Sequence, residues 1–437
     1  MDCDVLIIGG GPAGASLAYY LSGKNYKVII VEKKKEIDTP VRCAELVPVN
    51  FAGLFDFKIS GINNHIDFMD TFMQDAGNFL PAQKPGFEKV KRNNAPGFML
   101  DREVFIKDLI ERYKRNGGVF LKGAKAVSMD TGISNPGTAG KHKLVTVMIN
   151  ASDKNSYLRK QTLNVSAKII VGADGPMSAI GKLMGSENKK FMLGFQERLQ
   201  LKYNLLKLSP GKGNLKQCPD SCCGTKMNAA GFYFSPFIKK GYGWIFPKKD
   251  YFNVGVGIEQ GSSRMLKEIY NLFKNQVLAG DFSLNNAVNS SGAEPGAHAH
   301  NGRQIATVLN TITGLIPVSG MTGNPVCENL ILAGDAAGLA DPLTGAGIYN
   351  AVYSARIVSG IIQKSLEKDD LYMLREIISV YKKEFGPSLA RSLAGKELQE
   401  KSWPVLENLN EKGNEDTGFA MLIKKSWPMF KEYYAST

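Results

Sequence analysis

Three short runs of apolar residues, far apart along the 437-residue chain, each stop at a glycine turn. They fall at residues 5–8, 169–171 and 330–333. A run that is apolar at every position is typical of a strand buried on both faces of a parallel sheet. Helical patterns follow the first run at 13–21 and the third at 346–363. This alternation predicts an α/β architecture built on a parallel sheet.

Elsewhere the period of the pattern changes. Between 191 and 260 apolar residues recur at every second position, which predicts a mainly antiparallel sheet, and the irregular stretch 50–96 fits strands and loops of the same second layer. Residues 143–149 read as a strand with a hairpin turn after it. Helices are expected at 103–115, with Asp101 as N-cap, at 265–276 and at 371–381, where Gly386-Pro387 interrupts the pattern before a helical, basic tail.

The first glycine turn has the spacing of a dinucleotide-binding site. Gly9, Gly11 and Gly14 follow G-x-G-x-x-G, in which the first glycine makes the turn, the second lets a pyrophosphate approach and the third packs helix against strand. The second predicted strand, 27–31, ends at Glu32, a carboxylate that can accept hydrogen bonds from a ribose diol. The order of strand, turn, helix, strand and terminal acid predicts a dinucleotide site, which this motif alone does not assign to NAD or FAD.

Composition narrows the setting of the protein. The formal net charge of +13 favours anionic partners such as lipid headgroups or phosphates, although a solvated basic surface explains it equally well. Nucleic acid is not expected, because the lysines are dispersed and no nucleic-acid motif occurs. No apolar run has the length of a membrane span, and the first strand begins at once without room for a signal peptide. We therefore expect a cytoplasmic protein, with peripheral contact to a membrane surface left open.

The six cysteines do not suggest a disulfide framework in such a protein. Cys218, Cys222 and Cys223 form a C-x3-C-C cluster, but structural zinc generally needs four ligands and no fourth lies nearby, so no metal site is predicted.

The three glycine turns together are more specific than any one of them. The N-terminal fingerprint, the central V-G-A-D-G and the late G-D-A-A-G-L-A-D-P-L-T-G-A-G resemble the FAD-binding fold of the p-hydroxybenzoate hydroxylase type. The resemblance implies that Asp174 and Gly175 lie near the flavin pyrophosphate and that Asp335 hydrogen-bonds the ribityl chain. It also implies that Arg102 reaches the cofactor phosphates, against the alternative of an ordinary surface arginine.

Two further stretches narrow this resemblance. The sequence Y-G-W-I-F-P at 242–247 with V-G-V-G at 254–257 resembles the Y-x-W-x-F-P…V-G-x-G pattern of the geranylgeranyl reductase family. Residues 42–45, R-C-A-E, resemble the family's R-C-G-E segment, with Ala44 where glycine is usual. Because glycine reaches conformations that alanine avoids, this difference puts the local backbone geometry in doubt. The resemblance runs from Cys3 to about Ile362, and the tail carries no recognisable motif.

The fold expected from pattern and resemblance is an α/β (α+β composite) protein of three parts. Residues 1–50, 97–185 and 305–365 are predicted to form a discontinuous Rossmann-like FAD-binding domain with a parallel sheet. Residues 51–96 and 186–304 are predicted to form the antiparallel substrate domain, and 366–437 a C-terminal helical segment.

The late glycine motif has a physical reason of its own. Glycine and alanine ahead of a helix leave backbone N–H groups unobstructed, so the helix N-terminus can stabilise an anionic reduced flavin ring. The predicted cofactor-binding residues are Gly9, Gly11, Pro12, Ala13, Gly14, Glu32, Lys33, Arg42, Cys43, Ala44, Arg102, Ala126, Asp174, Gly175, Gly334, Asp335, Pro342, Gly345, Ala346, Gly347 and Ile348.

The family's long apolar substrate implies an apolar tunnel that ends at the flavin. Tyr242, Trp244 and Phe246 share one face of a strand, so they line such a pocket together or pack in the core together. Cys43 is the candidate catalytic residue, as a thiol near the flavin that positions substrate or delivers a proton, or else a small apolar packing residue. Glu45 is the alternative proton source, provided that burial raises its pKa.

The resulting hypothesis is an FAD-dependent reductase that saturates C=C bonds of a geranylgeranyl-type chain on a lipid, by hydride from flavin N5 and a proton. NAD(P)H or a ferredoxin-like carrier would supply electrons, since no second complete dinucleotide fingerprint occurs. One alternative is a flavin monooxygenase or halogenase, although Tyr242 replaces the first tryptophan of the halogenase pattern. Another is a non-catalytic redox-sensing flavoprotein. The apolar and basic stretch 419–434 suggests either an interfacial helix or, more simply, packing on the protein.

Overall fold

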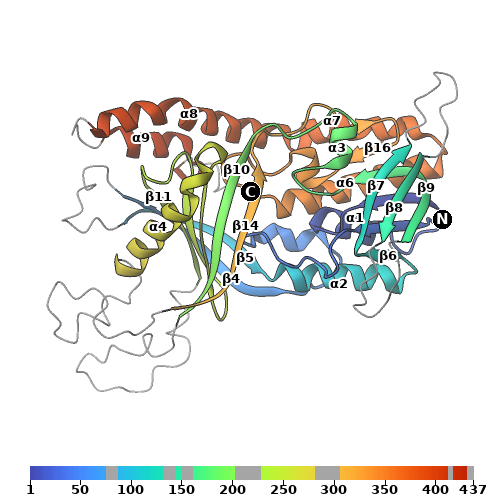
Figure 1. Ribbon diagram of the computed structural model, residues 1–437, viewed down its shortest axis with the longest axis horizontal. Coiled ribbons are helices and arrows are strands. Elements are labelled where there is room, and N and C mark those ends of the chain that lie inside the picture. The colour runs from blue at the N-terminus through green and yellow to red at the C-terminus, as the bar shows by residue number, and fades with distance from the viewer. Residues whose placement is uncertain are drawn as a thin grey trace, which may run out of the picture.

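Two sheets stand end to end along the long axis of the molecule, with helices packed on them (Figure 1). The computed structural model describes residues 1–74, 87–130, 143–149, 161–201, 228–280, 306–411 and 417–430. Within these ranges each sheet has eight strands. The predicted combination of a parallel sheet, a mainly antiparallel sheet and C-terminal helices is confirmed.

The first sheet contains all three apolar runs that end in glycine turns. Its parallel strands lie in the order β16 (Leu330–Leu332), β9 (Gln161–Gly172), β1 (Asp2–Ile8), β2 (Val28–Glu32) and β6 (Val119–Lys122). β15 (Val326–Cys327) pairs antiparallel with β16, and β8 (Lys143–Ile149) joins β7 (Ala124–Asp130) to β9. Because parallel strands align their carboxyl ends, the glycine turns after β1, β9 and β16 meet at one edge.

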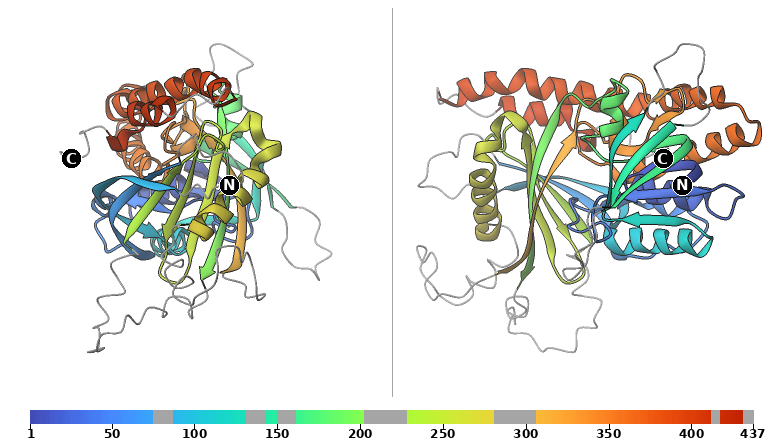
Figure 2. Two further views of the ribbon diagram at one scale, coloured as in Figure 1. Left: turned by 90° about the vertical axis from the view of Figure 1, so that its left-hand side faces the viewer. Right: turned by 45° about the vertical axis from the view of Figure 1, so that its right-hand side comes forward.

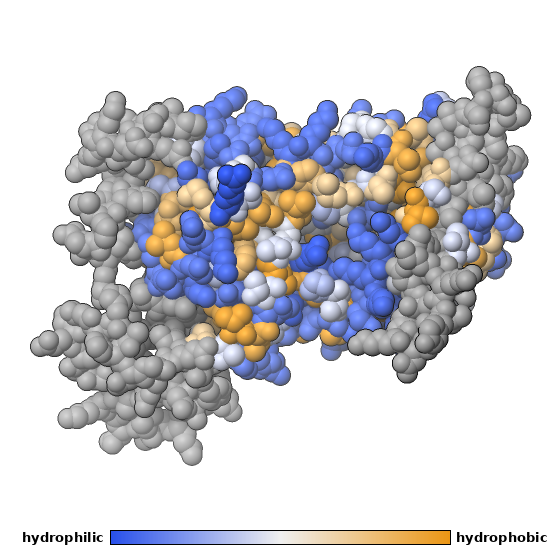
Figure 3. Space-filling view, viewed as in Figure 1, coloured by the Kyte–Doolittle hydropathy of each residue, from blue (hydrophilic) through white to orange (hydrophobic). Residues whose placement is uncertain are grey.

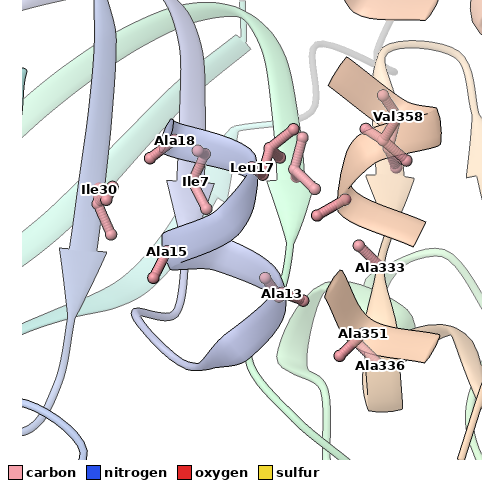
Figure 4. Packing of buried hydrophobic residues seen from close by; sticks show 14 of the residues in the cluster. Ile7, Ala13, Ala15, Leu17, Ala18, Ile30, Ala333, Ala336, Ala351 and Val358 are labelled. Atoms are coloured by element: carbon pink, nitrogen blue, oxygen red, sulfur yellow. The ribbon is translucent and has the colours of Figure 1, made fainter. Parts of the chain in front are cut away.

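Helix α1 (Pro12–Leu21) packs between α2 (Arg102–Arg115) and α6 (Ile348–Glu367). Small side chains make this packing close: Figure 4 shows Ala13 of α1 facing Ala351 of α6, with Ala333 beside them. The predicted N-cap of α2 is confirmed, since the Asp101 carboxylate accepts a hydrogen bond from the Val104 N–H. The short helices α3 (Ala179–Leu183) and η6 (Gly334–Ala337) follow the other two glycine turns.

The second sheet carries the period-two segments. Its strands are ordered β14 (Ala306–Pro317), β10 (Phe191–Leu201), β13 (Phe252–Glu259), β12 (Tyr242–Pro247), β11 (Ala229–Phe234), β4 (Ile62–Met73), β5 (Glu88–Leu100) and β3 (Leu46–Pro48). All neighbours are antiparallel except β11 and β4. Helix α4 (Leu266–Gly280) covers one face after η5 (Gln260–Met265), and η1 (Val49–Leu54) follows β3.

Strand pairing differs from two of the predicted domain boundaries. β14 pairs along its length with β10, and β3 pairs with β5, so both strands extend the second sheet, whereas the predicted FAD-binding domain includes their residues. Pairing between distant segments is a tertiary property that the local pattern does not contain. The division into domains itself stays a prediction.

The C-terminal helices run along both sheets: Leu374, Ile377 and Tyr381 pack in the core of the first sheet, and Trp403 and the residues of 419–429 pack on the second (Figures 1 and 2). They are η7 (Leu371–Arg375), α7 (Glu376–Glu384), α8 (Gly386–Glu411), α9 (Thr417–Ser426) and η8 (Pro428–Phe430). Phe419, Leu422 and Ile423 of α9 and Trp427 after it are buried in one cluster with Phe232 of β11. This face of α9 therefore packs on the protein, as the simpler of the two sequence interpretations has it.

The helices within the described ranges do not include one both long and apolar enough to cross a bilayer. On the face in Figure 3, apolar side chains are interspersed with hydrophilic ones.

Helix α8 carries one lysine into the interior. Lys396 is 4% exposed, and its Nζ donates to the Lys240 carbonyl at 2.7 Å and lies 3.4 Å from Met192 Sδ. Glu400 and Glu259 are the nearby anions, and Lys190 and Lys240 the nearby cations. Burial lowers the pKa of Lys396 from its ordinary value of 10.5 to about 8, the opposing pull of the two carboxylates being smaller.

A pH-dependent stability follows from this burial. Since the folded state holds the pKa of Lys396 below its unfolded value, the buried charge costs stability below about pH 8 and the cost is relieved toward pH 10.5. Lys396→Met should be the more stable protein near neutral pH. Its advantage in the free energy of urea unfolding should shrink by up to about 3 kcal/mol as the pH is raised. If the free energy of unfolding depends on pH in the same way in both proteins, this account of Lys396 is contradicted.

Candidate functional site

A cavity of about 1370 Å³ lies between the two sheets. It runs from the glycine turn after β1, past residues 42–48, to β12 and the segment after α9. Pockets for one small ligand usually occupy roughly 300–1,000 Å³. The cavity thus has room for a dinucleotide and a second, apolar ligand.

The glycine fingerprint is built as its spacing predicts. Gly9 has φ of +107°, and a Cβ there would lie 2.3 Å from the Ala173 carbonyl oxygen, so the turn needs glycine. A Cβ on Gly14 would lie 1.9 Å from the Gly9 oxygen, which makes Gly14 the site of close helix packing. A Cβ on Gly11 would meet nothing within 4 Å, so this position opens into the cavity. A phosphate can therefore approach the start of α1 there.

Glu32 closes the same end of the cavity. Its two carboxylate oxygens accept hydrogen bonds from the Gly10 N–H at 2.7 Å and the Lys34 N–H at 2.8 Å. Each oxygen keeps a second lone pair, so the group can still accept from a ribose diol as predicted.

The two other glycine turns each bring an aspartate to the cavity. Asp174 accepts from the Ser178 hydroxyl at 2.6 Å and the Ala179 N–H at 2.7 Å, which fixes the start of α3. Among the described residues none donates a hydrogen bond to the Asp335 carboxylate, although the side chain lines the cavity. Burial raises the pKa of both carboxyl groups. A half-buried acceptor such as Asp335, with no donor among the described residues, fits a ligand that carries hydroxyl groups.

Most predicted cofactor residues line the cavity. They are Gly9, Gly11, Pro12, Ala13, Glu32, Lys33, Arg42, Cys43, Ala44, Arg102, Ala126, Asp174, Gly175, Asp335, Gly345, Ala346, Gly347 and Ile348. Gly14, Gly334 and Pro342 do not. Gly14 instead lets α1 pack closely on β1 and its turn, and Gly334 lets α1 and α6 approach, because a Cβ on Gly334 would lie 3.0 Å from the Ala13 Cβ and 3.2 Å from the Ala351 Cβ. Pro342 is buried beside the cavity-lining turn.

Arg102 lies at the cavity but already has a partner. Its guanidinium donates to the Asp38 carboxylate over 2.6 and 2.8 Å, with the arginine side chain 12% exposed. This bidentate ion pair is a strong, directional contact. The alternative of an ordinary surface arginine is wrong, while contact with cofactor phosphates stays a prediction.

The aromatic residues of β12 form one wall of the cavity. Tyr242, Trp244 and Phe246 all line it and belong to one buried cluster, so the expectation that they act together is confirmed. The Tyr242 hydroxyl donates to the Thr344 carbonyl in the loop before α6. The wall thus begins at the loop predicted to face the flavin ring.

Polar side chains on one face of the second sheet hold residues 43–45 by hydrogen bonds. Gln196 Nε2 donates to the Cys43 carbonyl at 3.3 Å, and Asn253 Nδ2 donates to the Ala44 carbonyl at 3.0 Å. Gln196 and Asn253 come from the adjacent strands β10 and β13. The Cys43 thiol is half-buried at the cavity, accepts a hydrogen bond from the Glu45 N–H at 3.3 Å, and has its pKa raised by burial.

Glu45 is enclosed by ion-pair and hydrogen-bond partners. It is 1% exposed, but its Oε2 lies 3.0 Å from Lys248 Nζ and 3.2 Å from an Arg198 nitrogen, and its Oε1 accepts from the Arg102 N–H at 2.9 Å. Both oxygens of the carboxyl group therefore already accept from donors, and these contacts anchor the segment. A role of Glu45 as proton source stays a prediction.

The replacement of glycine by alanine at position 44 is harmless to the backbone. The residue with positive φ in this segment is Glu45, at 68°, and Ala44 is not among the residues in that region. The doubt raised by Ala44 is therefore resolved.

Sequence reasoning missed two groups of residues at the site. Gln196, Asn253, Lys248 and Arg198 hold residues 43–45, and Trp427, Pro428 and Met429 line the far end of the cavity. The polar residues at alternate positions 196 and 198 of a buried strand were an available signal, because buried polar groups need partners. No local signal placed the C-terminal residues at the cavity.

Comparison with known proteins identifies the fold and its cofactor. Residues 4–47 match the family model described as FAD dependent oxidoreductase. The chain is an FAD-dependent oxidoreductase. A curated relative in Methanococcus vannielii, named digeranylgeranylglycerophospholipid reductase, is 27% identical over 99% of this chain and 97% of its own. The predicted resemblance to geranylgeranyl reductases is thereby confirmed.

Solved structures agree on the fold of this oxidoreductase. A geranylgeranyl bacteriochlorophyll reductase-like protein of Thermoplasma acidophilum has a TM-score of 0.67 at 23% identity, with 99% of this chain and 98% of that chain covered. The flavin-dependent halogenase CmlS has a TM-score of 0.57 at 16% identity, with 97% and 67% covered. At these identities the likeness concerns architecture, which does not fix the reaction.

The open glycine cradle and the donor-free Asp335 fit FAD. The cysteine cluster at 218, 222 and 223 lies outside the described residues.

The opening at Gly11 gives a direct test of FAD binding. Gly11 has φ of −77°, which any residue adopts, and its Cβ direction is empty, so Gly11→Val should fold normally. The added side chain fills the place of the pyrophosphate and should leave the protein without FAD, measured as flavin absorbance per chain. Gly360→Ala on α6, where a Cβ also meets nothing within 4 Å, is the matched control and should retain FAD. Full FAD occupancy in Gly11→Val would contradict the placement of the pyrophosphate at Gly11.

Proposed function

We propose that this protein reduces C=C bonds in the isoprenoid chain of a lipid. The observation that carries the proposal is the aromatic wall of the cavity, which starts at Thr344 and continues to Trp427 and Met429. A long apolar chain has the chemistry to lie along such a wall. Support comes from the relative named digeranylgeranylglycerophospholipid reductase, whose whole length this chain matches.

The residues of the cavity favour this chemistry in two ways. The residues of the glycine turns would hold a reduced flavin at the start of the aromatic wall, where it would supply hydride to one carbon of the alkene. Trp244, Phe246 and Trp427 exclude water from the chain, which keeps the reacting groups close. Gly347 caps α6 without a side-chain hydrogen bond, so the first N–H groups of the helix offer partial positive charge beside the loop.

We assign to Cys43 the role of proton donor in the reduction of the alkene. Burial raises the pKa of its thiol above the ordinary value of 9.0, so the proton stays on Sγ at neutral pH. The thiol lies at the cavity, where it can give its proton to the second carbon of the alkene.

The environment of the reaction is also a proposal. A lipid substrate and a net charge of +13 fit work at an anionic membrane surface. An external donor, either NAD(P)H or an acidic carrier protein drawn to the basic surface, would reduce the flavin.

An anaerobic experiment separates the proposed reductase from an oxygen-using enzyme of the same fold. The purified protein is reduced with dithionite and mixed with a geranylgeranyl lipid. We expect flavin reoxidation together with a lipid that has gained two hydrogens for each bond reduced. If the flavin stays reduced with every isoprenoid lipid but reacts productively with oxygen and an aromatic substrate, a monooxygenase is the better assignment. A flavin that reacts usefully with neither would favour a redox sensor.

The role of Cys43 is tested by Cys43→Ala. We expect normal flavin content and a single-turnover rate of alkene reduction lowered by about 10²-fold or more, the usual contribution of a positioned acid. Cys327→Ala, at an exposed cysteine, serves as the control. An unchanged rate in Cys43→Ala would show that the thiol only packs.

A further inference from the structure

One buried amide joins the aromatic wall to the cysteine segment. Gln196 is 2% exposed and lines the cavity. Its Oε1 accepts the indole N–H of Trp244 at 2.8 Å, and its Nε2 donates to the Cys43 carbonyl at 3.3 Å. Because an indole nitrogen can only donate, the oxygen of the amide must face Trp244 and the nitrogen must face Cys43.

The position of Gln196 on the sheet makes this connection direct. In the pairing of β10, β13 and β12, Gln196 and Trp244 both pair with Gly255, so they flank it on neighbouring strands. A Cβ on Gly255 would lie 2.4 Å from the Trp244 ring and 2.7 Å from the Phe195 carbonyl oxygen. The glycine therefore leaves the space that the indole ring occupies between Gln196 and β12.

The other polar contacts to this segment act on the residues after Cys43. Asn253 holds the Ala44 carbonyl, and Lys248 and Arg198 hold the Glu45 carboxylate. Of these four side chains, Gln196 alone lines the cavity. It is also the one whose amide carries a second N–H with no acceptor among the described residues.

We propose that Gln196 is a positioning residue, which holds the Trp244 ring and the Cys43 backbone in one fixed relation across the cavity wall. Its two hydrogen bonds have opposite polarity, so no apolar or acceptor-only side chain can make both. The inference rests on the proposed function in one respect only, which is that the proposed function makes the Cys43 thiol a proton donor. The placement itself is a property of this chain and can be measured without turnover.

The test measures how readily the Cys43 thiol reacts. Protein as purified with its flavin is treated with iodoacetamide, and alkylation of each cysteine is followed by peptide mass spectrometry. In Gln196→Met, a side chain of similar length without the amide, we expect Cys43 to be alkylated roughly five- to tenfold faster, because its segment opens more often. The exposed Cys327 should react as in the wild type and serves as an internal reference.

Two further variants keep the result interpretable. Gln399→Met removes another buried amide, 3% exposed and bonded to Ser426 Oγ at 3.0 Å, without touching residues 42–45. It should leave Cys43 reactivity unchanged. Gln196→Glu keeps the acceptor for Trp244 and loses the donor for Cys43, so it should also speed alkylation, and it covers the case in which Gln196→Met does not fold.

Each outcome decides between the roles. Cys43 alkylation within twofold of wild type in both Gln196 variants would overturn the proposal, as would an equal increase in Gln399→Met. Faster alkylation confined to the Gln196 variants supports positioning. If these variants then reduce the alkene as fast as wild type, positioning stands and the proton role of Cys43 fails. If even the wild type reduces no isoprenoid, the proposed function fails while the alkylation result still holds.

Discussion

The chain crosses from the first sheet to the second at residues 38–48, and a buried carboxylate fixes the crossing. Glu45 lies between Lys248, which is fully buried, and Arg198, and it also accepts the N–H at the start of α2. Removing both ions from water is costly, and their attraction offsets that cost only while every partner is present. Loss of one partner from a buried pair typically costs about 3–5 kcal/mol. The edge of the cavity that carries Cys43 therefore depends on this group.

Near that crossing, one face of the second sheet carries both polar and apolar side chains, and the two kinds make different contacts. Asn253 and Gln196 bond the backbone of residues 43–44, while Trp244 and Phe246 face the cavity as an apolar surface. The far end is closed by Trp427, whose ring contacts Phe234 with centroids 4.8 Å apart, and the Asn93 amide donates to the Met429 carbonyl at 3.0 Å. The tail that carries no family motif is thus part of the cavity wall.

The fold is shared with flavin enzymes of other chemistry, including a halogenase. The glycine turns explain what is common, because they serve only to bring helix N-termini and backbone N–H groups to a dinucleotide. What can distinguish this chain is the second sheet, where the aromatic wall and the fastened Cys43 segment face the same cavity. Reaction specificity in such a family resides in those side chains and not in the architecture.

The sequence by itself determined the elements whose cause is local. A fully apolar run is typical of a strand buried on both faces, and glycines at fixed spacing favour the turns that follow, so β1, β9, β16 and most of the residues that line the cavity near the glycine turns were predictable. The alternation of Tyr242, Trp244 and Phe246 likewise followed from the period of a strand.

Tertiary structure decided what depends on contacts between distant segments. It placed β14 beside β10, paired Arg102 with Asp38, surrounded Glu45 with donors from three elements and brought Trp427 to a cavity begun at Gly9. The residues next to each contact do not identify its partner. A glutamate or a tryptophan has the same local sequence whichever side chains cover it in the folded protein. Only the folded chain shows which group supplies each partner.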